Sequence, residues 1–422
     1  MTCVNALLDP VPLARMAPVE QAFDEEQLSD VAAGVRAELE RPAIAATVRP
    51  GMRIAVTAGS RGIRDMPTVV RETVAYLKRM GAEPFVIPAM GSHGGASASG
   101  QQEILAAYGI TPETVGCPVR ATMEVTRIGQ LDDGRPILID RYAAQADGIV
   151  VINRVKAHTA FRGRYESGVM KMMTIGLGKQ AGAEVCHSQG ILRLGPNVEK
   201  FAFGILQNAN ILFGIGIVEN ALDRTAMVRA MTAEEIPRIE PDLLAEAKRR
   251  MARLLLDRVD VLVVDEIGKD ISGEGMDPNI AGRWIVPTVT GGIQAQRVAV
   301  LSLTEETLGN SVGLGMADVC SRQAAERVNA DMTYPNSLTS KVPCLCAIPM
   351  TLDNHRHTIQ AAVKMVPDKQ PGDVTIIRIR NTLCMSRIEI SENLMEEAAR
   401  QPGMRLCGEA APWRFDAQGN LF

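Results

Sequence analysis

Histidine is the side chain best suited to proton transfer near neutral pH, and the sequence contains five. His93 stands in Gly91-Ser-His-Gly-Gly95, where three glycines surround one imidazole. Glycine lets a ligand approach the backbone closely, so this segment favours a functional histidine over a simple turn. His158 stands in Lys156-Ala-His-Thr. It is either a second proton-transfer residue or a loop histidine that is hydrogen-bonded to the backbone.

An arginine lies in a third loop, Ser60-Arg61-Gly62, which on its own would also fit a turn with a solvated side chain. The three loops that carry Arg61, His93 and His158 each follow a β-prone run. In open parallel sheets, ligands bind beyond the carboxyl ends of the strands. The sequence therefore predicts that these three side chains lie at one edge of one sheet.

A lysine and a further histidine follow the His158 loop. Lys171 precedes an apolar run, which predicts a covered position. Buried lysines lose their charge readily and become nucleophiles or attachment points, whereas the alternative is a solvated lysine at a helix start. His187 follows Cys186 in an expected helix, and no partner at short zinc spacing accompanies them.

Two glycine-containing segments fall short of nucleotide-binding motifs. Gly178-Lys179 lacks the rest of a phosphate loop, because Met173 stands where the first glycine belongs and Gln180 where Ser or Thr belongs. Gly214-Ile-Gly216 lacks the third glycine of a dinucleotide fingerprint. The sequence therefore supports neither motif.

Polar loops also follow strand-like runs in the second half, at 265–279 and 304–310. Loops at strand ends often carry functional sites, but solvated turns explain these two equally well. His355 and His357 precede an expected helix, and we interpret them as surface or capping residues.

The elements that must position these loops alternate along the chain. Helical patterns occupy 20–40, 67–77 and 242–258. Alternating strands and helices predict an α/β fold with mostly parallel sheets. The β-prone runs cover 53–58, 84–88, 148–153, 211–218, 259–264, 297–303, 343–348 and 374–379.

A chain of 422 residues is longer than one hydrophobic core usually supports. We expect two α/β domains, residues 1–250 and 251–422, with the active-site cleft between them. The N-terminal domain would carry Arg61, His93, His158, Lys171 and His187.

Composition narrows the class of protein further. With 46% hydrophobic and 22% charged residues, the chain is globular rather than disordered. A net charge of -4 and the lack of a basic stripe argue against nucleic-acid binding, and the apolar runs are too short for a membrane helix. The eight cysteines are scattered, which is typical of free thiols in a reducing compartment. We expect a cytoplasmic protein.

Five segments, in order, resemble motifs of the nickel-dependent lactate racemase family, over roughly residues 50–350. The spacing from Lys171 to His187 also resembles the lysine-to-histidine spacing of the family. The segments are Ser60-Arg-Gly-Ile63, Gly91-Ser-His-Gly94, Lys156-Ala-His158, Ser167-Gly-Val-Met-Lys171 and His187.

This resemblance implies a nickel pincer nucleotide, a pyridinium mononucleotide that carries two sulfur groups. Lys171 would be joined to it through a thioamide, and His187 would be the protein ligand to nickel. Soft sulfur donors together with an imidazole suit this metal. Ser60 and Gly91 lie in the same motifs and are expected to contact the cofactor. Cofactor-biosynthesis enzymes are then expected partners.

The resemblance also implies a reaction, the racemisation or epimerisation of a 2-hydroxy acid. His93 and His158 would be the acid/base pair, and Arg61 would hold or polarise the substrate. The α-carbon proton of such an acid is very weakly acidic, whereas hydride removal needs a cofactor because no side chain accepts a hydride. Two histidines are needed because the two enantiomers present their hydroxyl groups in different directions.

The chain departs from the lactate-specific members at two places. Those members carry an aspartate just before the first arginine, where this chain has Ala58-Gly59, and Tyr, Gln and Lys in a second-domain loop, where this chain has 272–277. Lys269 or Arg283 would then replace the basic partner of the substrate carboxylate. We therefore expect another 2-hydroxy acid or a sugar acid rather than lactate.

Two other readings stay open from the sequence. One is a metal-dependent hydrolase or lyase with His93, His158 and His187 as direct metal ligands. The other is a non-catalytic binding homologue that retains the fold.

Overall fold

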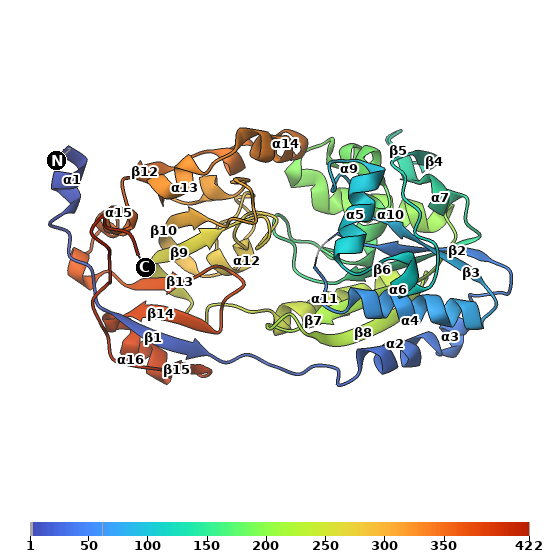
Figure 1. The fold of residues 1–422 in the computed structure, drawn as a ribbon, viewed down its shortest axis with the longest axis horizontal. Helices are drawn as coiled ribbons and strands as arrows, with labels where there is room; N and C mark the ends of the chain where they lie inside the picture. The colour runs from blue at the N-terminus through green and yellow to red at the C-terminus, as the bar shows by residue number, and fades with distance from the viewer. Residues whose placement is uncertain (1–2, 61, 422) are drawn as a thin grey trace. The chain divides into compact units, whose positions relative to one another are not determined.

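The structure is a computed structural model that describes residues 3–60 and 62–421. The chain forms two compact units (Figure 1). The N-terminal unit is Asp24–Met251, and the C-terminal unit combines the residues up to Phe23 with those from Ala252 onward. Residues up to 23, which the sequence assigned to the N-terminal domain, thus belong to the other unit.

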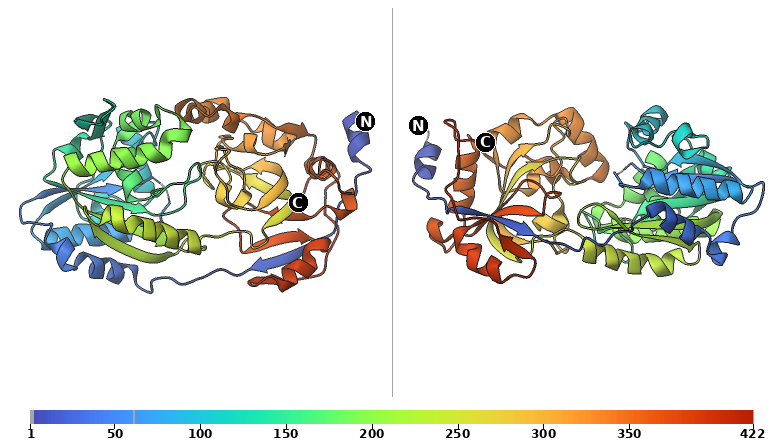
Figure 2. Two further views of the ribbon diagram at one scale, coloured as in Figure 1. Left: turned by 180° about the vertical axis from the view of Figure 1, so that it is seen from behind. Right: turned by 60° about the horizontal axis from the view of Figure 1, so that its bottom comes forward.

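The reason for this assignment is strand pairing. β1 (Met16–Gln21) pairs antiparallel with β14 (Arg387–Ser391) on one side and with β15 (Met404–Leu406) on the other. The two further views show the same arrangement of the three strands (Figure 2). The first strand of the chain therefore completes the sheet of the C-terminal unit.

The main sheet of the N-terminal unit has, within the described residues, the strand order β3-β2-β6-β7-β8. All neighbours are parallel except β7 and β8, which pair antiparallel. The α/β class with mostly parallel strands is confirmed for this unit. The strands are β2 (Arg53–Ala58), β3 (Glu83–Pro88), β6 (Gly148–Arg154), β7 (Ile211–Glu219) and β8 (Thr225–Thr232).

Hydrophobic residues cover both faces of this sheet. Along β6, Val150 and Ile152 point into one core, whereas Ile149 and Val151 point into the other. Such two-sided burial is typical of parallel strands, which read as continuous apolar runs. Helix α4 packs on the first face and α10 on the second (Figure 1).

The remaining elements of the N-terminal unit surround the sheet. The helices are α2 (Val31–Leu39), α3 (Pro42–Ala45), α4 (Met66–Arg79), α5 (Ala98–Ala107), α6 (Pro112–Val115), α7 (Arg141–Ala144), α8 (Val169–Lys171), α9 (Lys179–His187), α10 (Leu194–Asn208) and α11 (Ile236–Arg250), with the π-helix η1 (Met172–Gly176) and the 3-10 helix η2 (Ile191–Arg193). A small hairpin of β4 (Val125–Gln130) and β5 (Pro136–Asp140) pairs separately.

The described residues of the C-terminal unit form an eight-stranded sheet, in the order β12-β11-β10-β9-β13-β14-β1-β15. The first five strands of this order run parallel, and the last three are antiparallel to their neighbours. This unit is therefore also α/β. Its further strands are β9 (Arg258–Ile267), β10 (Gln294–Leu303), β11 (Val319–Ser321), β12 (Met350–Leu352) and β13 (Ile376–Ile379).

Helices cover this second sheet. They are α1 (Cys3–Leu8), α12 (Pro278–Ala281), α13 (Arg322–Glu326), α14 (Ala330–Ser340), α15 (His355–Lys364) and α16 (Met395–Arg400), with the 3-10 turns η3 (Leu314–Met316), η4 (Pro343–Cys346), η5 (Pro371–Asp373) and η6 (Glu392–Leu394). No described helix in either unit is both long enough and apolar enough to cross a membrane.

Three sequence predictions of single elements were wrong. The run 343–348 is not a strand, because it opens with the 3-10 turn η4, and short apolar runs cannot be assigned by periodicity alone. The segment 20–40 is divided between β1 and α2, whose first turn is capped by the side chain of Asp30. The helix expected at 242–258 begins earlier, at Ile236, where Pro237 is tolerated in the first turn, and it ends at Arg250.

Candidate functional site

The predicted loops follow three adjacent parallel strands. β3, β2 and β6 are neighbours in the sheet, so the loops after them leave from the same edge. These loops carry Ser60, His93 and His158. Arg61, which we expected to contact the substrate, lies outside the described residues.

His158 is in direct contact with Lys171. Nζ of Lys171 lies 2.6 Å from Nε2 of His158. The backbone N–H of Ala160 donates to Nδ1 of His158 at 3.0 Å, so the neutral ring carries its proton on Nε2. An Nε2–H group donates to Nζ only when the lysine is an uncharged amine. The contact therefore favours the uncharged, nucleophilic form of Lys171.

The ring of His158 is held in place by its surroundings. It stacks on the ring of Phe161, with the centroids 4.2 Å apart. Glu166 is fully buried and accepts from the backbone N–H of His158 at 2.7 Å and from Nζ of Lys248 at 2.6 Å. Arg162 donates to the carbonyl oxygen of His158 at 3.0 Å. The sequence motif includes Glu166, but nothing in it indicated this supporting role or the partner in α11.

Lys171 ends the short helix α8 and leads into the π-helix η1, a conformation that is frequent at functional sites. The buried carboxyl group of Glu240 lies beneath this segment and accepts from the backbone N–H of Met170 at 3.0 Å. Burial raises the pKa of Glu240 to about 7. A Cβ atom on Gly168 would lie 2.3 Å from Oε1 of Glu240, so a larger residue there would displace this carboxyl group.

His187 stands at the end of α9. Burial lowers its pKa to about 4, so the imidazole is neutral near pH 7. Its Nδ1 is buried and has no hydrogen-bond partner among the described residues. A neutral imidazole with an unused nitrogen is a suitable metal ligand. Burial raises the pKa of the neighbouring Cys186 thiol to about 12, so that side chain is not a thiolate.

The other half of the group contains Ser60 and His93. Oγ of Ser60 lies 2.5 Å from Nδ1 of His93, and the His93 side chain is exposed. The backbone N–H of Gly91 donates to the carbonyl oxygen of Gly176 at 3.3 Å. The His93 loop therefore packs against the segment that directly follows Lys171.

Lys179, rejected above as a phosphate-loop lysine, is fully buried. Its Nζ lies 3.0 Å from Oδ2 of Asp140, which is also fully buried. Burial lowers the pKa of the Lys179 ammonium and raises the pKa of the Asp140 carboxyl, while each charge opposes the shift of its partner. Lys179 therefore forms a buried ion pair with Asp140.

The basic residues expected to bind a substrate carboxylate have partners within the C-terminal unit. Nζ of Lys269 donates to the carbonyl oxygen of Gly273 at 2.6 Å. Arg283 forms an ion pair with Asp318 at 2.5 Å. The charge of Arg283 is therefore already compensated.

The interpretation of His355 and His357 as surface residues was wrong, because both are buried. His355 contacts Oε1 of Gln323 at 2.9 Å, and His357 contacts Asp9 at 2.9 Å. Both lie in the first turn of α15, where they link it to neighbouring segments.

The arrangement of possible metal ligands bears on the alternative in which three histidines bind a metal directly. Among the described residues, no group of three or more His, Cys, Asp or Glu side chains is arranged to hold a metal ion. A site with His93, His158 and His187 as direct ligands therefore has no geometric support.

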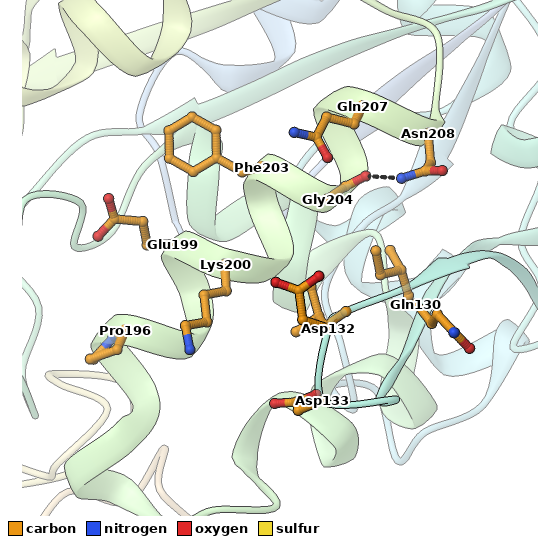
Figure 3. Close-up of a pocket in the computed structure, with 12 residues that line it drawn as sticks. Gln130, Asp132, Asp133, Pro196, Glu199, Lys200, Phe203, Gly204, Gln207 and Asn208 are labelled. Carbon is orange, nitrogen blue, oxygen red and sulfur yellow. Dashed lines mark hydrogen bonds between the residues drawn. The ribbon is translucent and has the colours of Figure 1, made fainter.

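A pocket of about 560 Å³ lies between α10 and the turn of the β4–β5 hairpin. Asp132, Asp133, Glu199, Lys200 and Phe203 are among the residues that line it (Figure 3). None of the residues predicted from the sequence as functional belongs to this lining.

Fold and loops together define a two-unit α/β protein with a lysine–histidine contact at the edge of its N-terminal sheet. The family model described as "Domain of unknown function (DUF362)" matches residues 55–279, and the chain belongs to this family. The matched region contains all five motifs described above.

Among solved structures, the chain is similar to the lactate racemase apoprotein from Thermoanaerobacterium thermosaccharolyticum. The sequences are 13% identical, the TM-score is 0.51, and the match covers 87% of this chain and 99% of that one. At this identity the likeness shows a distant lactate-racemase-like fold. No curated protein matches the sequence.

Proposed function

We propose that the protein is an isomerase that racemises or epimerises a 2-hydroxy acid or a sugar acid, with a nickel pincer nucleotide attached at Lys171. One observation carries the proposal. The N–H group at Nε2 of His158 donates a hydrogen bond to Nζ of Lys171 at 2.6 Å. This geometry favours an uncharged, reactive amine. The fold shared with a lactate racemase apoprotein supports it.

The described residues fit such a cofactor. Lys171 supplies an amine for covalent attachment, and His187 supplies a neutral imidazole whose Nδ1 lacks a hydrogen-bond partner among the described residues. When bound, the cofactor would supply reversible acceptance of a hydride, which no amino-acid side chain provides.

The protein's own residues then handle the proton of the substrate hydroxyl. The backbone N–H of Ala160 donates a hydrogen bond to Nδ1 of His158. Nε2 is therefore the atom of that ring that would exchange a proton with the substrate. Lys171 would hold the cofactor through a thioamide, whose nitrogen is a poor hydrogen-bond acceptor, so Nε2 of His158 would then be available to the substrate. The hydroxyl group of Ser60 is hydrogen-bonded to Nδ1 of His93. Proton exchange by His93 would therefore take place at its Nε2.

Two experiments test the proposal. The protein is coexpressed with nickel-pincer biosynthesis enzymes, and the intact mass and the peptide containing Lys171 are measured. We expect an added mass on Lys171, bound nickel, and none of that added mass in Lys171→Arg. Loaded protein is then screened for interconversion of the stereoisomers of 2-hydroxy acids and sugar acids by chiral chromatography.

Three outcomes would contradict the proposal. Zinc or manganese without covalent mass would favour a hydrolase or lyase. An unmodified, metal-free protein after coexpression would favour a binding protein. Added mass without turnover of any tested acid would contradict the assigned substrate class.

A further inference from the structure

Lys179 occupies an unusual position for a lysine. Its side chain is completely buried, and its backbone lies in the left-handed region with φ at +56°. Lysine is almost never fully buried unless it is paired, and left-handed backbone is rare for residues other than glycine. A buried charge on a strained backbone indicates that surrounding contacts require it.

Three oxygens surround Nζ of Lys179, matching the three N–H groups of an ammonium. The carbonyl oxygen of Pro88 lies at 2.5 Å, and Oε1 of Gln101 and Oδ2 of Asp140 each lie at 3.0 Å. Oδ1 of Asp140 also accepts from the backbone N–H groups that begin α7. Lys179 therefore joins the end of β3, helix α5 and the start of α7.

Gln101 passes this connection on to the His93 loop. Its side chain is fully buried, and its Nε2 donates to the carbonyl oxygen of Gly91 at 2.8 Å and to that of His93 at 3.2 Å. Lys179 determines the orientation of the amide, because a flipped amide would place Nε2 against Nζ and its oxygen against two carbonyl oxygens. The backbone on both sides of Ser92 is thereby held.

The position of Lys179 in the chain gives this contact its consequence. It lies eight residues after Lys171 and eight before His187. The N–H of Gly91 also donates to the carbonyl oxygen of Gly176, in the same segment. The His93 loop is thus attached at two points to the segment that joins Lys171 and His187.

We propose that Lys179 and Gln101 are positioning residues, which place the imidazole of His93 relative to the segment that carries Lys171 and His187. The role of His93 as an acid/base residue rests on the proposed function, whereas the placement of its loop does not. The His158 loop has an independent support, the buried Glu166 with Lys248. We therefore expect substitution of Lys179 or Gln101 to change only the His93 loop, and substitution of Lys248 to change only the His158 loop.

The test uses full-length protein without cofactor or substrate. The variants are Lys179→Met, which removes the ammonium, and Gln101→Glu, which keeps an acceptor for Lys179 but removes the two N–H donors. Lys248→Met is the matched control, because it removes a lysine from the support of the other loop. Amide hydrogen exchange is followed by mass spectrometry, and the imidazole nitrogens are titrated by NMR, for which a chain with five histidines is well suited.

We expect Lys179→Met and Gln101→Glu to raise exchange about tenfold or more in residues 90–97 and to change the titration of His93, with that of His158 unchanged. Lys248→Met should change His158 and residues 156–167 instead. Unchanged exchange and titration of His93 in a folded Gln101→Glu protein would overturn the proposal, as would equal loosening of both loops. If Lys179→Met does not fold, Gln101→Glu decides.

Failure of the isomerase proposal would appear in the mass and turnover measurements and would leave these readouts unaffected. Conversely, an active isomerase whose His93 titration ignores Gln101→Glu would refute the positioning role alone.

Discussion

Nζ of Lys171 and Nε2 of His158 lie 2.6 Å apart, and the hydrogen bond from Ala160 to the other ring nitrogen decides which of them carries the proton. The two residues are 13 positions apart in the chain and meet because the loop after β6 folds back through the bridge between Lys156 and Ser167. This geometry favours the uncharged, reactive form of the amine.

The reactivity of Lys171 can be measured directly. An ordinary lysine with a pKa near 10.4 is almost entirely protonated at pH 7, so an uncharged amine should react with a limiting acylating reagent about tenfold faster or more. We expect Lys171 to be modified ahead of the exposed Lys200 in peptide mass spectra. In His158→Phe this advantage should disappear. Equal rates for both lysines in the unmodified protein would refute the assignment.

Replacement of either proposed acid/base residue should abolish stereoisomer interconversion. General acid–base catalysis contributes roughly 10²- to 10⁴-fold, so His93→Ala and His158→Ala should each lower kcat by about that factor in cofactor-loaded protein. The side chain of His93 is exposed, and its removal should leave the circular dichroism spectrum unchanged. Full turnover in both variants would show that neither ring moves the proton.

Metal binding and covalent attachment should separate at His187. His187→Ala removes the expected protein ligand but leaves the amine of Lys171, so loaded protein should retain the added mass and lose most of its nickel. The measurement combines intact mass with metal analysis. Asn197→Ala, which removes a donor to the carbonyl oxygen of the adjacent Cys186, is a nearby control that should keep its nickel. Equal nickel in His187→Ala and wild type would exclude His187 as a ligand.

Stability should depend on pH through Glu240. The folded-state pKa is raised to about 7 from an ordinary value of 4.5, so the folded protein binds the extra proton between these values. The contribution to stability is fully present below pH 4.5 and is lost as pH rises to 7 and beyond. Relative to wild type, Glu240→Gln should gain up to about 3 kcal/mol between pH 4.5 and 8. Denaturant unfolding at several pH values checks this, and a pH-independent difference would contradict it.

The local sequence determined the strands and the loops that follow them. The β-prone runs at 53–58, 84–88 and 148–153 are strands of one sheet, because continuous apolar runs bury both faces of parallel strands. Loops after such strands must leave from one edge, and this property predicts that the loops of His93 and His158 lie at the same edge of the sheet. The glycines around His93 and the ordered motifs also belong to this local information.

Only the tertiary structure decided what supports those loops. Buried polar side chains support the loops of His93 and His158 and the segment of Lys171 through hydrogen bonds. Each of these bonds has a partner that is near only because of the sheet order and the helix packing. The side chains are Gln101, Glu166, Lys179 and Glu240. The pairing of β1 with strands near the end of the chain has the same origin. Periodicity reports which face of an element is buried, but it carries no information on which distant donor meets which acceptor. That choice is made when the elements pack, because buried polar groups are costly unless they are paired.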